Sequence, residues 1–426
     1  MDQTAKTAKQ ASIRLAAMGT DIKNRALAQI AAALKAAAGD IIAANKADLA
    51  AAENNHLAGP LLKRLKFDEN KLADACAGIE SLIKLDDPVG KTLGRTELDT
   101  GLELHKVTCP IGVIGIVFES RPDALVQIST LCLKSGNAAL LKGGSEAEHT
   151  NKALAKVICE AGENTGLPAG WLALLETRDD VAEMLKADQY IDLIIPRGSN
   201  QFVRYIMDNT NIPVLGHADG ICHVYIDREA DLDMAEQIVV DSKCQYTAVC
   251  NAAETLLVDE KIAKEFLPKV KAALEKESVE IRACEKSRAI IDVKPATEAD
   301  WSTEYLDLII SVKVVADLDE AIEHINKYGS GHTDTIVTAN KQSAETFMNF
   351  VDSANVFWNA STRFSDGFRY GLGAEVGIST NKIHARGPVG LDGLVIYKYK
   401  LLGTGQIVAD YAQGKGKFTH RKMDSV

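Results

Sequence analysis

The spacing of apolar residues divides the chain into parts of different character. Near the amino terminus alanine is abundant, and Leu27, Ile30 and Leu34 recur at intervals of three and four residues. This spacing places the three side chains on one face of a helix, so the first part is predicted to be helical. Residues 95–108 are instead polar around Thr100-Gly101, which predicts a two-stranded ribbon with a tight turn.

From Pro110 onward, short uninterrupted apolar segments alternate with amphipathic helical patterns. Strands are predicted at residues 111–118, 138–141, 171–175, 191–195, 222–226, 253–258, 334–338 and 354–358. Helices are predicted at residues 150–161, 230–241, 261–275 and 318–327. Continuous apolar strands that alternate with helices are typical of parallel sheets covered on both faces. Because the alternation of strands and helices begins again after Asp227, two α/β domains are expected, with their boundary near residues 220–228.

Length, charge and cysteine content narrow the class of protein. The chain has 426 residues, and its 48 basic and 59 acidic side chains give a net charge of −11. An acidic surface repels phosphate backbones, so neither nucleic acid nor an anionic membrane is expected as a partner. No apolar run approaches the roughly 18 residues that span a bilayer, and the polar start lacks a signal peptide's apolar segment. The eight cysteines form no CxxC pair, which favours the reducing cytoplasm.

The strongest chemical candidate is Cys250, in a loop of small residues before the predicted strand 253–258. A thiol presented in this way can attack a carbonyl carbon as the thiolate and form a thiohemiacetal or a thioester. Most cysteines in proteins are instead buried and inert. Spacing alone does not distinguish Cys250 from Cys244 as the nucleophile.

Two turns rich in glycine and small residues follow predicted strands, at residues 142–145 and 197–199. Each places a basic side chain and backbone N–H groups at the start of a helix, an arrangement that suits a phosphate-bearing ligand. Ordinary βα turns share this composition, but two of them in one domain favour a dinucleotide. The G-x-G-x-x-G and Walker A patterns are absent, and the nearest match, residues 371–377, is interpreted as a loop.

The segment 359–386 is unusually polar, and its Arg363, Arg369 and Arg386 could hold a carboxylate or a phosphate with two hydrogen bonds each. Any one of these arginines could equally be a solvated surface charge. His217 and His223 flank Cys222 but lack partners at metal-site spacing, so no metal site is expected.

Motifs along the chain match one known family in order: PIGVIGIVFESRPDA (110–124), LLKGGSEA (140–147), DLIIPRGS (192–199), GHADGICHVYID (216–227), VCNAAETLL (249–257), EYLDLIISVKVV (304–315), YGSGHTDTIVT (328–338) and the 359–391 block. On these motifs the whole chain resembles the glutamate-5-semialdehyde dehydrogenase (γ-glutamyl phosphate reductase) family of the aldehyde dehydrogenase superfamily. The resemblance implies an aldehyde-dehydrogenase-like fold of two α/β domains with parallel sheets and a β-ribbon oligomerisation arm.

The resemblance also implies a role for each segment of the chain. Residues 1–94 and 109–223 would bind NADP(H), residues 224–391 would form the catalytic domain with Cys250, and residues 95–108 and 392–426 would form the arm. The implied reaction is the NADPH-dependent reduction of L-glutamyl 5-phosphate to L-glutamate 5-semialdehyde and phosphate through a Cys250 thioester. This is the second step of proline biosynthesis from glutamate.

Further roles carry over from the family position by position. Arg121 aligns with an asparagine that helps to bind the oxyanion in the wider superfamily, and an arginine there could instead hold the acyl phosphate. His217 aligns with the general base of hydrolytic relatives, so phosphate rather than water is expected to take the acyl group. Cofactor contacts are expected from Lys142, Ser145, Gly198, Ser199 and Glu304, and substrate or phosphate contacts from Asn359, Arg363 and Arg386. The hydroxyl of Ser145 would favour NADPH over NADH.

Two other interpretations stay open on sequence grounds. A related dehydrogenase could transfer the acyl group to coenzyme A, although NASTRFSDG and ARGPVGL within residues 359–391 favour the glutamyl-phosphate reaction. A non-catalytic relative would be expected to have lost Cys250 or Lys142, and both are present. The resemblance further suggests a homo-oligomer and a transient contact with the glutamate kinase that makes the substrate.

Overall fold

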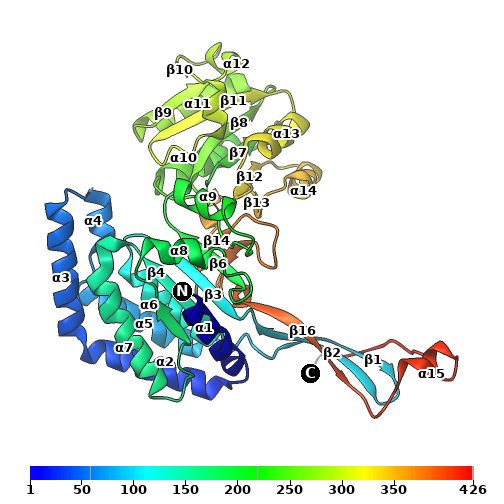
Figure 1. Ribbon diagram of the computed structural model, residues 1–426. Helices are drawn as coiled ribbons and strands as arrows, with labels where there is room; N and C mark the ends of the chain where they lie inside the picture. The colour runs from blue at the N-terminus through cyan, green and yellow to red at the C-terminus, as the bar shows by residue number, and fades with distance from the viewer. Residues whose placement is uncertain (58, 218, 425–426) are drawn as a thin grey trace. The chain divides into compact units, whose positions relative to one another are not determined.

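The computed structural model describes residues 1–57, 59–217 and 219–424. The chain divides into two compact units (Figure 1). Unit 1 comprises Met1–Gly198, Tyr205–Val214 and Val389–Val426, and unit 2 comprises Ser199–Arg204 and Leu215–Pro388. Helix α9 (Asn200–Asp208) spans one of the crossings between the units.

Unit 1 is built on a parallel sheet of four strands in the order β5-β4-β3-β6. Its strands are β3 (Val113–Phe118), β4 (Ala138–Gly143), β5 (Leu172–Leu174) and β6 (Leu193–Arg197). Every residue of β3 and β4 is buried, which agrees with the apolar runs 113–118 and 138–141. The strands predicted in this half of the chain are therefore confirmed, with small shifts at their ends.

Helices of unit 1 cover this sheet, and the amino-terminal ones extend the layer. They are α1 (Asp2–Leu15), α2 (Thr20–Ala36), α3 (Ala38–Asn54), α4 (Gly59–Leu65), α5 (Glu69–Lys84), α6 (Pro122–Lys134), α7 (Glu148–Glu163) and α8 (Arg178–Met184). Leu27, Ile30 and Leu34 are fully buried on one face of α2, as their spacing predicts.

No single helix within the described residues is long and apolar enough to cross a membrane. Only α2 and α3 reach that length and composition when taken together, and they are bent by 66° relative to each other.

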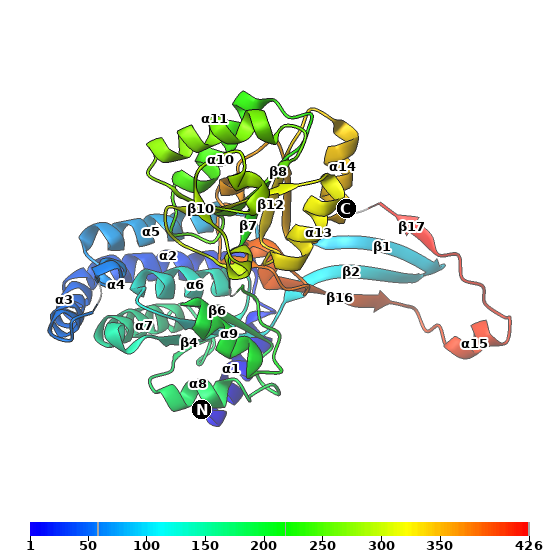
Figure 2. The ribbon, with the colours of Figure 1, turned by 90° about the horizontal axis from the view of Figure 1, so that it is seen from above.

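The predicted ribbon is part of a four-stranded antiparallel sheet in the order β16-β2-β1-β17 (Figures 1 and 2). It consists of β1 (Thr92–Asp99), β2 (Leu102–Pro110), β16 (Val395–Leu402) and β17 (Arg421–Met423), and the short helix α15 (Val408–Ala412) follows β16. Gly101, at a φ of 71°, forms the turn between β1 and β2. This antiparallel arm joins distant segments of the chain, since every residue of β16 pairs with a residue of β2.

Unit 2 contains a parallel sheet of seven strands in the order β10-β9-β11-β8-β7-β12-β13. The strands are β7 (Cys222–Ile226), β8 (Ala253–Asp259), β9 (Glu280–Ala283), β10 (Lys294–Pro295), β11 (Ile309–Val315), β12 (Thr333–Val337) and β13 (Asn355–Trp358). A domain boundary between residues 223 and 224 would cut β7, whereas the whole strand lies in unit 2, because it pairs with both β8 and β12.

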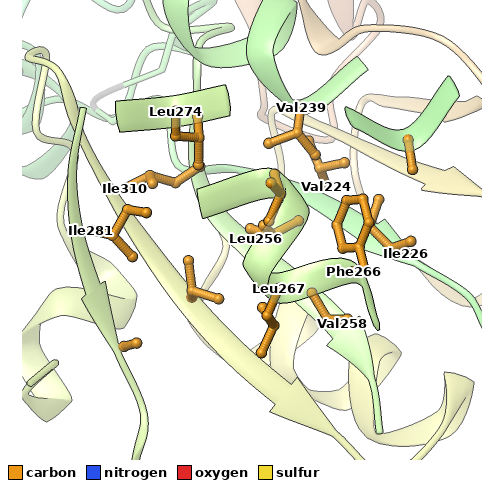
Figure 3. Packing of buried hydrophobic residues seen from close by; sticks show 14 of the residues in the cluster. Val224, Ile226, Val239, Leu256, Val258, Phe266, Leu267, Leu274, Ile281 and Ile310 are labelled. Carbon is orange, nitrogen blue, oxygen red and sulfur yellow. The ribbon is translucent and has the colours of Figure 1, made fainter. Parts of the chain in front are cut away.

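Both faces of the unit 2 sheet are buried, because neighbouring residues of its central strands point to opposite sides and hydrophobic clusters pack on each side. Val224 and Leu256 pack with Phe266 on the face covered by α10 (Leu232–Cys244) and α11 (Ala263–Lys276) (Figure 3). Tyr225 and Leu257, each the next residue along, pack on the other face beneath α13 (Leu318–Tyr328) and α14 (Lys341–Phe350). The predicted α/β organisation with two parallel sheets and an antiparallel arm is confirmed.

Candidate active site

Cys250 lies in the loop between α10 and β8, and the two ends of this loop are joined by a buried ion pair. Lys243, in the last turn of α10, donates to Glu254 of β8 across 2.5 Å, and both side chains are fully buried. Burial raises the pKa of Glu254 to about 7, against the opposing effect of Lys243. Removing either partner would leave an uncompensated charge in the interior, which is strongly destabilising. The ion pair therefore keeps the two ends of the loop together.

The main chain of Cys250 is held from the side of β7. Cys222 donates its S–H to the carbonyl oxygen of Cys250 across 3.2 Å. Gly220 packs so closely that a Cβ at this position would lie 2.2 Å from the same oxygen. The loop therefore has a defined position while the Cys250 side chain stays partly exposed.

The structure distinguishes the two cysteines that spacing alone did not. Burial, together with nearby Glu277, raises the pKa of Cys244 to about 11, so its reactive thiolate form is strongly disfavoured. Cys250 lies instead in a turn, next to two histidines and an arginine.

The histidines come from loops that precede neighbouring strands. Cys250 precedes β8, His217 precedes β7 and His332 immediately precedes β12, and these three strands are adjacent in the sheet. The ring centroids of His217 and His332 lie 4.8 Å apart in an edge-to-face arrangement. The Nδ1 atom of His217 donates to the carbonyl oxygen of Ile378 across 2.8 Å. The amino ends of three parallel strands thus bring together groups that are distant in sequence.

Arg363 is the cationic group that the structure places near Cys250. The 3₁₀ segment Thr362–Phe364 packs on the loop, where Thr362 donates to the carbonyl oxygen of Asn251 across 2.7 Å. Arg363 is 8% exposed and donates from Nε to the side chain of Gln245. Burial lowers the pKa of Arg363, nearby Arg369 lowers it further, and Cys250 raises it, so the guanidinium is within electrostatic range of the thiol.

Asn359 and Arg386 are engaged with other parts of unit 2. The side-chain amide of Asn359 accepts from the Thr338 N–H and donates to the Thr338 carbonyl oxygen, which extends the pairing beyond β12 and β13. Arg386 donates to the carboxylate and the carbonyl oxygen of Asp352. Both side chains therefore have structural roles here that their polarity in the sequence did not reveal.

Glu304 belongs to a second polar group in unit 2. Its carboxylate accepts from the side chain of Asn200 and from the Gly220 main chain, and burial raises its pKa. Asn200 also donates to Asp219 across 3.0 Å and directly follows Ser199. The predicted residues Ser199 and Glu304 are thus joined through Asn200, which the sequence analysis did not select.

Lys142 and Ser145 line one hollow of unit 1, together with Gly143, Gly144 and Lys152. Lys142 is almost buried and donates to the carbonyl oxygen of Gly143, while Ser145 is exposed. The charge of Lys152 is paired with Glu148 and Glu176. Glu148 and Glu176 line the same hollow, so Lys142 and the hydroxyl of Ser145 are the lining groups that suit the ribose and phosphate of a dinucleotide.

The turn that shapes this hollow also fixes the loop that carries Arg121. A Cβ on Gly144 would lie 2.1 Å from a carboxylate oxygen of Glu146, so a larger residue there would displace this carboxylate. The same oxygen accepts from both the main-chain N–H and the hydroxyl of Ser120, each across 2.6 Å. Arg121 follows at the N-cap of α6 in unit 1. Gly198, at the end of β6, is the last residue of the first segment of unit 1.

Comparison with known proteins gives consistent matches along the chain. The model of the aldehyde dehydrogenase family matches residues 1–288. The gamma-glutamyl phosphate reductase of Pelotomaculum thermopropionicum is 67% identical over 100% of this chain and 98% of its own. That of Acetivibrio thermocellus is 68% identical over 98% of this chain and 96% of its own.

Solved structures agree with these sequence matches. The crystal structure of gamma-glutamyl phosphate reductase from Thermotoga maritima has a TM-score of 0.93 and 44% identity, and the match covers 95% of this chain and 99% of that one. An acetylating aldehyde dehydrogenase from Geobacillus thermoglucosidasius has a TM-score of 0.63 at 18% identity, with 95% of this chain and 96% of that one covered, and shares the fold.

Proposed function

The chain belongs to the γ-glutamyl phosphate reductase family of aldehyde dehydrogenase-type oxidoreductases, and we propose that it reduces L-glutamyl 5-phosphate to L-glutamate 5-semialdehyde with NADPH. Phosphate is the second product. In a cell that makes proline from glutamate, this reaction is the second step. The observation that carries the proposal is the setting of Cys250, partly exposed on a loop whose ends are pinned by a buried ion pair.

Cys250 would act as the nucleophile. Its thiolate attacks the C5 carbonyl carbon of the acyl phosphate, the carbon–oxygen bond to phosphate breaks, and phosphate leaves with the bonding electrons. The product is a thioester on Cys250. NADPH, when bound, supplies the hydride that reduces this thioester carbon. Collapse of the resulting thiohemiacetal releases the aldehyde and restores the thiolate.

The residues that we propose for the cofactor are the five that the resemblance to the family indicates. In unit 1 the hollow is lined by the ammonium group of Lys142, the small hydroxyl of Ser145 and the ammonium group of Lys152, which is paired with Glu148 and Glu176. A carboxylate at position 145 would repel a 2′-phosphate, whereas a serine accepts one. Gly198, Ser199 and Glu304 would contact the pyrophosphate and the nicotinamide ribose. The bond from Asn200 to Glu304 supports a shared role for these residues.

Arg363 is the group that we assign to the substrate's phosphate or α-carboxylate, because it is the arginine held at the Cys250 loop. Arg121 is assigned to the acyl phosphate on the resemblance alone. Asn359 and Arg386 are left out of the proposed substrate contacts, since Thr338 and Asp352 engage their polar groups.

Two features of the chain fit the compartment and the oligomeric state that we propose for it. All eight cysteines, each within the described ranges, are free of disulfides, which fits a reducing compartment such as the cytoplasm. The antiparallel arm ends in an edge strand, β16, with exposed apolar side chains, which fits a homo-oligomer assembled through the arm.

The experiment that tests the function uses the reverse reaction, with full-length protein, glutamate semialdehyde, NADP and phosphate. We expect NADPH formation that requires phosphate, and its loss in Cys250→Ala with the thermal unfolding temperature unchanged. Cys244→Ala is the matched control and should retain most activity. Substantial turnover in Cys250→Ala would refute the covalent mechanism. Turnover that requires coenzyme A in place of phosphate would instead support the acyl-transfer alternative.

A further inference from the structure

Three side chains of unit 2 form a cluster with metal-ligand chemistry. A ring nitrogen of His217, the sulfur of Cys250 and a ring nitrogen of His332 all lie within 4.8 Å of one another. We propose that these three residues form a binding site for Zn²⁺ that, when filled, captures the Cys250 thiol. Sequence spacing excluded such a site around His217 because the other two ligands precede different strands.

One ring nitrogen of each histidine already lies close to an oxygen atom of the protein. His217 donates from Nδ1 to the carbonyl oxygen of Ile378 across 2.8 Å. In His332 the Nδ1 atom lies 2.8 Å from the Thr333 hydroxyl. Zinc-binding histidines are commonly oriented in this way by a hydrogen bond from the other ring nitrogen to a carbonyl or similar group.

The Nε2 atom of His332 is the observation that points to a ligand. His332 is fully buried, and this nitrogen has no hydrogen-bond partner among the described residues. A buried polar nitrogen without a partner is costly, and in the tautomer with the proton on Nδ1 coordination to a cation would satisfy it. His217 and Cys250 are only partly buried, so an ion would enter from their side of the cluster.

One thiolate and two imidazoles are a donor set that zinc prefers, with tetrahedral geometry and bonds of about 2.3 Å to sulfur and about 2.0 Å to nitrogen. These bonds place sulfur and nitrogen about 3.6 Å apart, so the donor atoms need to move closer by about 1 Å. The Cys250 S–H proton passes to solvent as the sulfur–zinc bond forms, and water completes the fourth position.

Two neighbours define the limits of the site. Cys222 lies 3.8 Å from Nδ1 of His332 but donates its S–H to the Cys250 carbonyl oxygen, so it stays a thiol and is not a fourth ligand. The positive charge of Arg363 opposes a second cation nearby, and formation of the thiolate offsets this repulsion. Coordination to zinc lowers the nucleophilicity of the sulfur, so a filled site would slow its attack on an acyl phosphate. That inhibitory consequence rests on the proposed function of Cys250, whereas the metal site does not.

Binding can be measured without any assay of activity. Full-length protein is titrated with Co²⁺, whose thiolate complex has a charge-transfer band in the near ultraviolet, and Zn²⁺ is then added to displace it. We expect one ion per chain, loss of the band in Cys250→Ala, and affinity weakened by more than about 100-fold in His217→Ala, beyond the loss typical of an outer-shell partner. Cys244→Ala and the exposed His56→Gln are matched controls and should bind as the unmodified protein does.

The outcomes separate this site from the proposed function. Equal Co²⁺ affinity in His217→Ala and unmodified protein, or a charge-transfer band that persists in Cys250→Ala, would overturn the site. If Cys250→Ala lost the band yet still reduced the acyl phosphate, the site would stand and the covalent mechanism would fail. Slower alkylation of Cys250 by iodoacetamide in the presence of Zn²⁺, reversed by EDTA, is the further result expected from capture of the thiol.

Discussion

Gly220 and Cys250 touch through their main chains. A Cβ on Gly220 would lie 2.2 Å from the carbonyl oxygen of Cys250 and 2.4 Å from its Cα atom, far inside van der Waals contact. The loop that carries His217 and the loop that carries Cys250 therefore pack as one body. The position of the proposed nucleophile depends on a residue that has no side chain and takes no part in the chemistry.

Replacing Gly220 with alanine should displace the Cys250 loop and lower kcat/KM by about 100-fold, the loss that a misplacement of about 1 Å can cause. The measurement is the phosphate-dependent reaction, with thermal unfolding as a check on folding. Gly78→Ala is the matched control, because a Cβ there meets nothing within 4 Å inside helix α5. It should leave kcat/KM unchanged and add about 0.5–1 kcal/mol of stability. Unaltered kinetics in Gly220→Ala would contradict the packing.

Replacing Ser145 with glutamate should weaken NADPH binding by about tenfold more than NADH binding, because a carboxylate would face the 2′-phosphate at short range. Ser145 is exposed, so solvent limits the effect to about 1.4 kcal/mol. Fluorescence titration with each cofactor measures it, and Ser145→Ala is the control for loss of the hydroxyl alone. Equal losses for both cofactors would mean that this turn does not hold the adenosine ribose.

His324 should make the protein less stable in mild acid. It is 3% exposed, and burial lowers its pKa from 6.5 to about 2, with His223, Lys313 and Lys327 adding to the effect. Below pH 6.5 the unfolded chain takes up a proton on this ring and the folded chain does not, so unfolding is favoured as pH falls. The free energy of unfolding should fall by about 1 kcal/mol between pH 7 and pH 5.5 on account of this residue.

Urea unfolding of His324→Gln at the two pH values isolates that contribution. The glutamine can still accept from Lys313, which lies 3.3 Å from Nδ1 of His324, but cannot take up a proton. The variant should therefore show a smaller difference in stability between pH 7 and pH 5.5. An identical pH dependence in both proteins would show that His324 is not the group responsible.

The edge strand β16 should control assembly. Tyr397, Tyr399 and Leu401 alternate onto one face of this strand and are 49%, 59% and 57% exposed. Changing Tyr399 and Leu401 together to lysine should shift the assembly towards monomer, since charged edge strands resist pairing. Sedimentation velocity measures the state. Lys398→Glu with Lys400→Glu, on the opposite face, is the control for a change of charge. An assembly unaffected by the lysine variant would exclude this face from the interface.

The sequence by itself determined the elements and the main chemical candidate of this protein. Buried strands such as β3 are continuous apolar runs, and helices such as α2 have apolar residues at helical spacing, so local pattern predicts both. The turn at Thr100-Gly101 and the loop of small residues around Cys250 are also local features. Each depends on residues that are neighbours in the chain.

Only the tertiary structure decided which of these residues meet. The strand order β8-β7-β12 does not follow the chain, and it is this order that brings His332 beside His217 and Cys250. The tertiary structure also pairs Lys243 with Glu254, at the two ends of the Cys250 loop, and Arg386 with Asp352. A polar side chain has the same identity in the sequence whether it faces substrate or a structural partner. Its role is set by the groups that long-range packing places within hydrogen-bonding distance.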